Sequence, residues 1–410
     1  MLNQYRCLDV CDEKGFFAGK LLGDLGADII KIEEPTGDSW RKTEHGFRSK
    51  VYSEKNLYWQ AFNVNKRSVT LDIETPEGQD IFRELVLISD VVIESFQPGY
   101  LDQFDLSYDR LRQINPKIIL TSVTPFGQEG PYRDFITSDL VSMSMGGISW
   151  LMGDADRPPV TVGAPQAFLF AGAYAVIATL IALYYREMGG EGQHVEISIQ
   201  QCLAPLTLNT IPHWTLNRRL VKRAGNRRSG LTSRASQRQT WKCKDGYVTL
   251  TIYGGARGAK TNYPLVNWMN EKGMATDYLR EKDWSSFDLA KVTSEDWKSI
   301  ETPIASFFMM HTRAELFEEA VKRGIMLFPV YELKDLLSDT QLKARGFWVS
   351  VKYPELGNCV YPGAFAKYSD NDIEILRPAP AVGEHNLEVY QGELNMSEKH
   401  LLRLKQKGVI

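Results

Sequence analysis

The densest group of chemically active side chains is a run of cations between residues 217 and 238. Eight cations occur there with no acidic residue among them. They are Arg218, Arg219, Lys222, Arg223, Arg227, Arg228, Arg234 and Arg238. Such groups can bind an anion, pair with an acidic subunit surface or lie in a solvated linker. A nucleic-acid site is not indicated, because aromatic residues are not interleaved and the whole chain is not basic.

A second chemical candidate is the pair Cys7 and Cys11. Their CxxxC spacing is not a usual zinc or redox signature, and few histidines lie nearby. The chain has five cysteines, an odd and scattered set that favours a reducing cytoplasm over a disulfide framework. We interpret the pair as two small side chains at the end of a strand and predict no metal site.

The elements that must position any site begin as an alternation of strands and helices. The predicted strands are 6–10, 27–32, 68–72, 91–93 and 118–123, with helices predicted at 14–25, from 76 and at 107–113. This order indicates a Rossmann-like α/β sheet in the first part of the chain. No GxGxxG or Walker A motif accompanies it, so a standard dinucleotide or P-loop site is not supported.

The longest apolar stretch runs from Phe168 to Tyr185 and reaches the length of a membrane span. It contains Gly172 and several alanines, and it continues directly into Arg186, Glu187 and a Gly-rich turn. We therefore interpret it as a buried core helix. The chemistry is expected at the turn that precedes this helix.

Bulk composition is that of a globular protein. The chain has 410 residues, 43% of them hydrophobic and 24% charged, with a net charge of −3. Two or three domains fit this length, and the near-neutral charge gives no field that would favour nucleic acid or an anionic membrane. The first residues have no apolar segment behind a basic start, so no signal peptide is predicted. We expect a cytoplasmic protein.

Several longer segments follow one another in a definite order. They are LLGDLGADIIKIEEPTGDSWR, NKRSVTLDIETPEGQDIFRELV, SDVVIESFQPGYLDQF, NPKIILTSVTPFGQEGPYRD, EGQHVEISI, RGFWVSVKYPELGNCVYPGAFAKYS and RPAPAVGEHNLEVY. Together they resemble the class III CoA-transferases, the CaiB/BaiF or formyl-CoA transferase type, over essentially the whole chain.

This resemblance implies a Rossmann-like large domain built from both chain ends, a smaller α/β domain and two linkers. Two such chains would thread through each other as an interlocked-ring dimer. The expected parts are 1–215 (large domain), 216–239 (basic linker), 240–330 (small α/β domain) and 331–410 (second linker and return to the large domain). The cationic run falls in the first linker, which favours an interface role for it.

Members of this family move CoA from an acyl-CoA donor to a free carboxylate through acyl–enzyme anhydride and enzyme–CoA thioester intermediates. This chemistry needs a carboxylate nucleophile at an accessible turn. By the resemblance, Phe168 occupies the position of the nucleophilic aspartate, and no Asp or Glu lies between Asp156 and Glu187. We predict that this chain has no catalytic residue of its own.

Other positions expected to contact CoA also depart from the family pattern. These degenerate CoA-binding positions are Glu13, Lys14, Glu34, Ser95, Phe96 and Gln103. Glu34 and Gln103 stand where cations are usual, and losing cations beside the CoA phosphates weakens charge-assisted contacts. The glycine-rich flap of the small domain is also missing, since residues 229–234 carry one glycine.

The related acyl-CoA racemases use a Gly-His-Asp segment as part of their acid–base pair. The matching segment here is Thr137-Ser138-Asp139, without the histidine. Racemase activity is therefore not expected, because proton transfer alpha to a thioester needs a base on each face. We interpret Asp139 as a residue at the N-terminus of a helix.

The sequence thus predicts a catalytically silent subunit of a heteromeric class III CoA-transferase, interlocked with a homologous, Asp-bearing catalytic subunit. Within the family it is most similar to the non-catalytic subunit of the succinyl-CoA:(R)-benzylsuccinate CoA-transferase of anaerobic toluene degradation. Coenzyme A and acyl-CoA would be substrates of the complex, with no covalently bound cofactor. The residues assigned to the interface or to a substrate carboxylate are Arg227, Arg228, Arg234 and Arg238. Two alternatives remain, a self-sufficient transferase with a displaced nucleophile and a non-catalytic acyl-CoA-binding protein.

Overall fold

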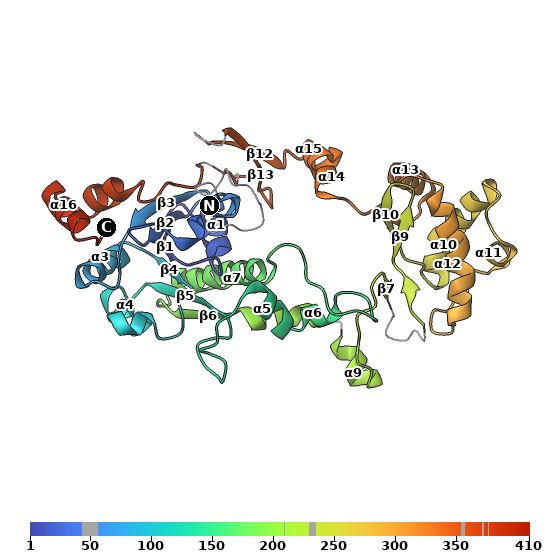
Figure 1. The fold of residues 1–410 in the computed structure, drawn as a ribbon, viewed down its shortest axis with the longest axis horizontal. Coiled ribbons are helices and arrows are strands. Elements are labelled where there is room, and N and C mark those ends of the chain that lie inside the picture. The colour runs from blue at the N-terminus through green and yellow to red at the C-terminus, as the bar shows by residue number, and fades with distance from the viewer. Residues whose placement is uncertain (43–55, 209, 229–234, 354–356, 371–372, 376) are drawn as a thin grey trace. The chain divides into compact units, whose positions relative to one another are not determined.

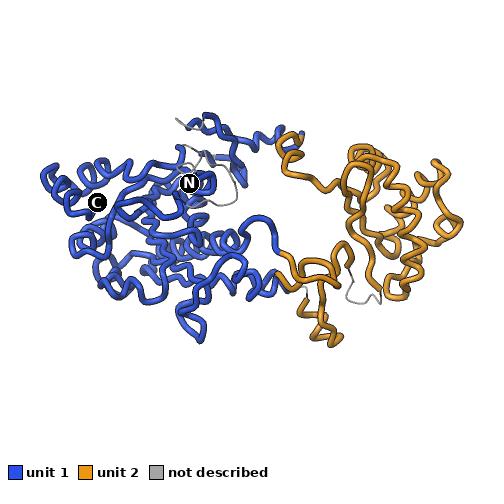
Figure 2. Tube along the Cα trace, viewed as in Figure 1, with its two compact units in different colours: residues 1–148, 161–207, 340–410 blue, residues 149–160, 208–339 orange. Residues whose placement is uncertain are grey.

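The chain folds into two compact units. The computed structural model describes residues 1–42, 56–208, 210–228, 235–353, 357–370, 373–375 and 377–410. The large unit comprises Met1–Ile148, Thr161–Thr207 and Thr340–Ile410, and the small unit comprises Ser149–Val160 and Leu208–Asp339 (Figure 2). The large unit therefore takes segments from both ends of the chain. The two linkers and the interlocked dimer stay predictions.

A six-stranded sheet forms the centre of the large unit (Figure 1). Its strand order is β3-β2-β1-β4-β5-β6, and every pairing is parallel. The strands are β1 (Arg6–Val10), β2 (Asp28–Glu33), β3 (Lys66–Thr70), β4 (Val91–Glu94), β5 (Ile119–Thr124) and β6 (His194–Ser198). The predicted α/β class with a parallel sheet is confirmed.

Helices cover both faces of this sheet. The helices of the large unit are α1 (Phe16–Asp24), α2 (Leu57–Phe62), α3 (Pro76–Leu87), α4 (Tyr108–Ile114), α5 (Asp139–Met145), α7 (Ala167–Glu187), α8 (Ile199–Leu203), α15 (Thr340–Ala344) and α16 (Glu398–Gln406), and α6 (Ile148–Leu151) begins at its boundary. On one face, Thr121 of β5 bonds Thr179 of α7 through their hydroxyls at 2.8 Å. On the other, Leu120 shares a buried cluster with Leu85 of α3 and Leu111 of α4. Consecutive residues of β5 thus point to opposite faces of the sheet, toward different helical layers.

Helix α7 is the predicted apolar helix, and it packs closely on α1. A Cβ added at Gly172 would lie 2.9 Å from the Phe17 Cβ and 3.2 Å from the Ala18 backbone nitrogen, so only glycine fits this approach. By length and composition α7 could cross a membrane, but half of its most apolar window is buried in the chain. The buried half is the face that lies against α1 and the sheet.

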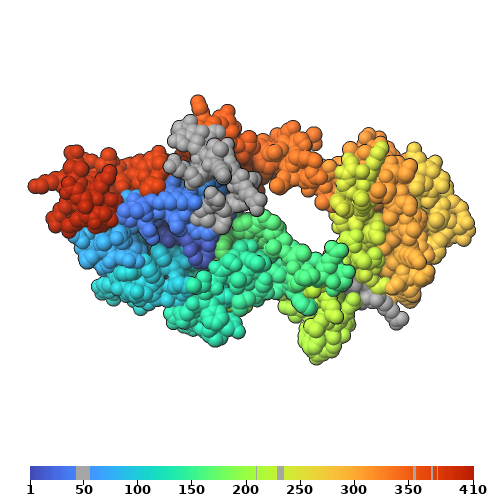
Figure 3. All heavy atoms as spheres, in the orientation of Figure 1, coloured from blue at the N-terminus to red at the C-terminus, as the bar shows by residue number. Residues whose placement is uncertain are grey.

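The C-terminal segment returns to the first strands of the large unit. In the space-filling view the red C-terminal residues lie against the blue N-terminal ones (Figure 3). The Tyr390 hydroxyl, in the helical turn η4 (Leu387–Glu393), donates to the Thr70 carbonyl at 2.8 Å. Arg67 of β3 pairs with Glu388 at 2.8 Å and with Glu393 at 2.6 Å. These contacts fix the end of the chain on β3.

The small unit is built on a three-stranded antiparallel sheet of order β11-β10-β9. The strands of this sheet are β9 (Thr240–Cys243), β10 (Gly246–Leu250) and β11 (Leu327–Pro329). Strands β7 (Arg227–Arg228) and β8 (Gln237–Arg238) pair separately. The helices of the small unit are α9 (Ile211–Asn217), α10 (Gly255–Glu271), α11 (Asp277–Glu281), α12 (Ser294–Met309), α13 (Arg313–Arg323) and α14 (Leu333–Ser338). A separate hairpin, β12 (Trp348–Tyr353) and β13 (Gly357–Pro362), belongs to the large unit.

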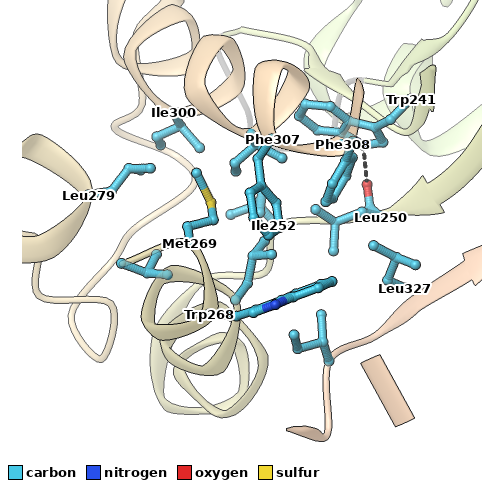
Figure 4. Packing of buried hydrophobic residues seen from close by; sticks show 14 of the residues in the cluster. Trp241, Leu250, Ile252, Trp268, Met269, Leu279, Ile300, Phe307, Phe308 and Leu327 are labelled. Atoms are coloured by element: carbon cyan, nitrogen blue, oxygen red, sulfur yellow. Dashed lines mark hydrogen bonds between the residues drawn. The ribbon is translucent and has the colours of Figure 1, made fainter. Parts of the chain in front are cut away.

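An aromatic core holds the small unit together (Figure 4). Trp268 meets Phe307 edge-on, with ring centroids 4.8 Å apart, and Trp241 donates its indole N–H to the Leu250 carbonyl at 3.0 Å. Every described residue in this cluster belongs to the small unit. The unit therefore has its own hydrophobic core, as a domain requires.

Candidate functional site

A cavity of about 610 Å³ lies at the carboxyl ends of strands β1 to β4. The chain runs outward from β1 to β3 on one side and from β4 to β6 on the other, so the strand order reverses between β1 and β4. In parallel α/β sheets, ligands bind at this switch point. Residues that directly follow the strands line the cavity, including Asp12, Glu34, Asp72 and Phe96.

The lining of this switch-point cavity is strongly acidic. Its carboxylates are Asp12, Glu33, Glu34, Asp38, Asp72 and Glu74. Lys31 is the only cation among its described lining residues, and it is 1% exposed. Its ammonium donates to the Cys11 carbonyl and lies 3.7 Å from Asp9 and 3.6 Å from Asp38. Burial alone would lower the pKa of Lys31, but these two carboxylates hold it above its ordinary value.

The nearby guanidinium of Arg41 is also bound by other groups of the chain. It donates to both carboxylate oxygens of Glu33 at 2.6 Å and to the Pro380 carbonyl at 3.0 Å. Burial would raise the pKa of Glu33, but the bonds from Arg41 hold it below its ordinary value. Lys31 and Arg41 thus neutralise carboxylates of the chain itself, and neither is free to bind a phosphate.

The degenerate CoA-binding positions fall in different places around this cavity. Glu34 and Phe96 line it, and Phe96 stacks on Tyr100 with ring centroids 4.5 Å apart. Ser95 is buried behind the wall, where its hydroxyl donates to Asp12 at 2.8 Å.

The remaining three degenerate positions do not line the cavity. Lys14 pairs with Asp12 just before α1. Its neighbour Glu13 has a pKa raised to about 7, chiefly by burial and then by the charge of Asp12. Gln103 is exposed in the short helix η2 (Leu101–Phe104).

Phe168 lies in the first turn of α7 and is 5% exposed. The nearest acidic group found there is Asp139, the first residue of α5. Its carboxylate accepts the backbone N–H of Ala167 at 2.7 Å, at the N-terminus of α7. Burial raises the pKa of Asp139 despite the N–H groups that face it. Asp139 therefore begins a helix, as predicted, and also caps a second one.

The described arginines of the predicted set belong to the small unit, whereas the residues that line the switch-point cavity belong to the large unit. Arg227 of β7 forms a two-point ion pair with Glu301, at 2.8 and 3.0 Å. Arg228 of the same strand is exposed, and Arg238 lies on β8. Arg234 falls outside the described residues.

Comparison with known proteins decides what this scaffold is. A sequence profile described as CoA-transferase family III matches residues 2–386. The chain belongs to this family. The predicted resemblance is thereby confirmed.

Two curated relatives of this family III chain are named as subunits. It is 33% identical over 398 residues to succinyl-CoA:(R)-benzylsuccinate CoA-transferase subunit BbsE of Thauera aromatica, covering 94% of this chain and 93% of that protein. It is 30% identical over 398 residues to the succinyl-CoA–L-malate CoA-transferase beta subunit of Chloroflexus aurantiacus, covering 96% and 94%. A solved CaiB/BaiF family protein from Brucella suis superposes with a TM-score of 0.80 at 27% identity, covering 95% and 98%.

Several cavity residues of this family III chain were missed by sequence reasoning. Asp12, Asp38, Asp72 and Glu74 are not among the predicted site residues, although Asp12 and Glu74 lie two residues after predicted strands and Asp72 ends one. That position was the available signal, because the carboxyl ends of parallel strands meet at one edge. Among the described residues, no cluster of three or more His, Cys, Asp or Glu side chains could hold a metal ion.

A second cavity has a volume of about 440 Å³. Three polar side chains from neighbouring strands line it: Glu94 of β4, Ser122 of β5 and His194 of β6. Glu94 is 5% exposed and accepts the Phe96 backbone N–H at 2.7 Å. Ser122 lies between Glu94 and His194, and its hydroxyl is 2.8 Å from the His194 Nε2. Burial raises the pKa of Glu94 to about 7.

Replacing this buried carboxyl is expected to change how stability depends on pH. Between its unfolded and folded pKa values, Glu94 binds a proton in the folded chain but not in the unfolded chain. The wild type therefore loses stability as pH rises through this window, by about 3 kcal/mol from roughly pH 4.5 to 7. Glu94→Gln should remove this loss. The free energy of unfolding of the variant, relative to that of the wild type, should therefore be higher at about pH 8 than at about pH 5.

Urea unfolding of the two proteins at both pH values measures the effect. Glu84→Gln, an exposed change on α3, is the matched control and should leave the pH dependence unchanged. A pH-independent difference between Glu94→Gln and the wild type would contradict the prediction.

Proposed function

We propose that this chain is a catalytically silent subunit of a heteromeric family III CoA-transferase. The observation that carries the proposal is Phe168, a buried aromatic in the first turn of α7 where the family's nucleophilic aspartate is expected. A phenyl ring has no oxygen with which to form an acyl anhydride. The covalent steps would then take place on the aspartate of a homologous partner subunit.

The charge of the switch-point cavity supports this proposal. CoA carries phosphate groups, whose usual partners are Arg and Lys side chains. Here Lys31 and Arg41 are bound by the chain's own carboxylates, and Glu34 adds an exposed acid to the lining. A cavity of this charge repels a phosphate, so CoA would be held mainly by the partner.

An apolar stripe on α7 supports association with a second chain. Ile177, Ile181 and Tyr184 of α7 and Met188, its C-cap residue, recur at three- or four-residue spacing, and each is more than half exposed. Such a stripe on a long helix is typical of an interaction surface. We assign its cover to the homologous, Asp-bearing subunit, in an interlocked heteromer located in the cytoplasm.

The relatives' names suggest the substrates. One is a succinyl-CoA:(R)-benzylsuccinate transferase subunit and the other a succinyl-CoA–L-malate transferase subunit. Succinyl-CoA is therefore our proposed donor, and a dicarboxylic acid such as benzylsuccinate is our proposed acceptor.

The isolated chain tests the proposal. Purified alone, it is expected to transfer no CoA from succinyl-CoA to benzylsuccinate or malate. Treatment with hydroxylamine in the presence of succinyl-CoA should leave every carboxylate of the chain unmodified by mass spectrometry. Turnover by the homogeneous chain, or a hydroxamate on one of its Asp or Glu residues, would refute catalytic silence.

One observation favours a second candidate, a self-sufficient transferase with a displaced nucleophile. The carboxylate of Asp139 lies at the N-terminus of α7, 2.7 Å from the backbone nitrogen of Ala167. Ala167 directly precedes Phe168 in the sequence. Backbone N–H groups at a helix N-terminus can stabilise an anion. On this alternative, hydroxylamine would label Asp139, and Asp139→Asn would abolish both labelling and turnover.

A further inference from the structure

The small unit contains a cavity of its own that the proposed transferase function does not use. It has a volume of about 460 Å³ and is lined by β7, β8 and one face of α12. Ser294, Lys298, Thr302 and Ser306 follow one another at four-residue spacing along α12, so their side chains share that face. Arg238 faces them from β8.

Glu301 is the single carboxylate among the described residues that line this cavity, and it is already neutralised. Glu301 is 6% exposed, and both of its oxygens accept from the Arg227 guanidinium. One of them also accepts the backbone N–H of Arg238 at 2.7 Å. Arg227 and Glu301 therefore cancel, and the charges of Arg238 and Lys298 remain.

Arg238 is half-buried, and among the described residues its guanidinium forms no ion pair with a carboxylate. Its carbon lies 5.2 Å from the centre of the Trp241 ring, which holds the side chain in place. Its Nε is buried and has no hydrogen-bond partner within the described part of the chain. Buried polar groups are nearly always hydrogen-bonded, so this unpartnered donor shows that the chain itself does not satisfy the guanidinium of Arg238.

We propose that this cavity binds a small oxyanion, a phosphate or carboxylate group, between Arg238 and Lys298. The planar guanidinium offers paired N–H donors, which match two oxygens of either group. The ammonium of Lys298 supplies a second charge, and the hydroxyls of Thr302 and Ser306 supply neutral donors. All of these residues belong to the small unit, so the site is complete without the switch-point cavity.

Calorimetric titration of the full chain tests this site. Inorganic phosphate and succinate, titrated separately at low ionic strength, distinguish a phosphate site from a carboxylate site. At least one is expected to bind saturably with one ion per chain. Arg238→Gln and Lys298→Gln should each weaken that binding by about 10- to 100-fold, the range for a lost hydrogen bond to a charged group.

Two features keep the test independent of folding. Lys298 is exposed on α12, so its substitution should leave the thermal unfolding midpoint unchanged. Arg257→Gln, an exposed change on α10 outside the cavity, is the matched control and should bind as the wild type does. Saturable binding by neither anion, or equal affinity in wild type and Lys298→Gln, would overturn the proposal. The anion-binding proposal does not depend on the proposed CoA-transferase function, so a failure of that function would not contradict it.

Discussion

Transfer of CoA by a complex of this chain with an Asp-bearing relative is expected to fall at least about 1000-fold when the relative's nucleophilic aspartate becomes asparagine. A substitution at the matching position of this chain, Phe168, should change the rate of CoA transfer little. Phe168→Leu exchanges one buried apolar side chain for another, and the rate should change by less than about threefold. The contrast assigns the covalent step to one subunit of the pair.

The reason for the asymmetry is chemical. An anhydride needs a carboxylate oxygen, and asparagine cannot supply one at the relative's position. Phe168 is 5% exposed and contributes packing in the first turn of α7, so leucine preserves most of what it does. Initial rates of succinyl-CoA consumption by the two-subunit complex, with each variant purified in the same way, give the comparison.

Asp139→Asn in this chain is the control that separates the alternatives. Asparagine keeps an oxygen that can accept the Ala167 N–H, so the cap on α7 should persist. If the chain is silent, this variant transfers CoA at the wild-type rate. If Asp139 is a displaced nucleophile, the chain alone transfers CoA and Asp139→Asn abolishes that activity, and the silent-subunit proposal fails.

The fold was largely predictable because it rests on apolar periodicity. The β-branched runs before residue 125 gave strands at nearly their observed positions, and the uncharged stretch from Phe168 gave α7. Strand β3 was placed two residues late, at 68 instead of Lys66. Lys66 and Arg67 are both buried and ion-paired, and charged residues at a strand start resemble a loop in the sequence.

The candidate site was less predictable, because its properties depend on pairings between distant segments. Nothing in the sequence shows that Arg41 is held by Glu33 and by the Pro380 carbonyl, which lies 339 residues away. The same is true of Arg227 and Glu301 in the small unit. Which cations remain free is therefore a property of the fold. Arg238 could be named from charge density alone, but its orphaned Nε could not.

Removing either member of the buried pair of Asp9 and Lys66, next to the switch-point cavity, is expected to destabilise the large unit strongly. Both side chains are 0% exposed, and their charged atoms lie 2.7 Å apart. Lys66 also donates to the Asn63 side chain at 2.9 Å and to the Phe16 carbonyl at 3.2 Å. Burial alone would raise the pKa of Asp9, but the ammonium groups of Lys66 and Lys31 hold it below its ordinary value.

Lys66→Met should lower the free energy of unfolding of the large unit by about 3–5 kcal/mol, because it leaves the carboxylate of Asp9 buried with a weaker partner. Asp9→Leu should cost a similar amount, because it leaves Lys66 without a carboxylate and Lys31 with Asp38 alone. Combining them removes both members of the pair, so the double variant should cost several kcal/mol less than the sum of the single changes.

Urea unfolding followed by fluorescence measures the free energy of unfolding of each variant. Glu318→Ala, which breaks an exposed pair with Lys322 on α13, is the surface control and should cost no more than about 1 kcal/mol. Additive costs would mean that Asp9 and Lys66 act independently, whereas strong coupling would identify the pair as one structural unit that supports the floor of the cavity.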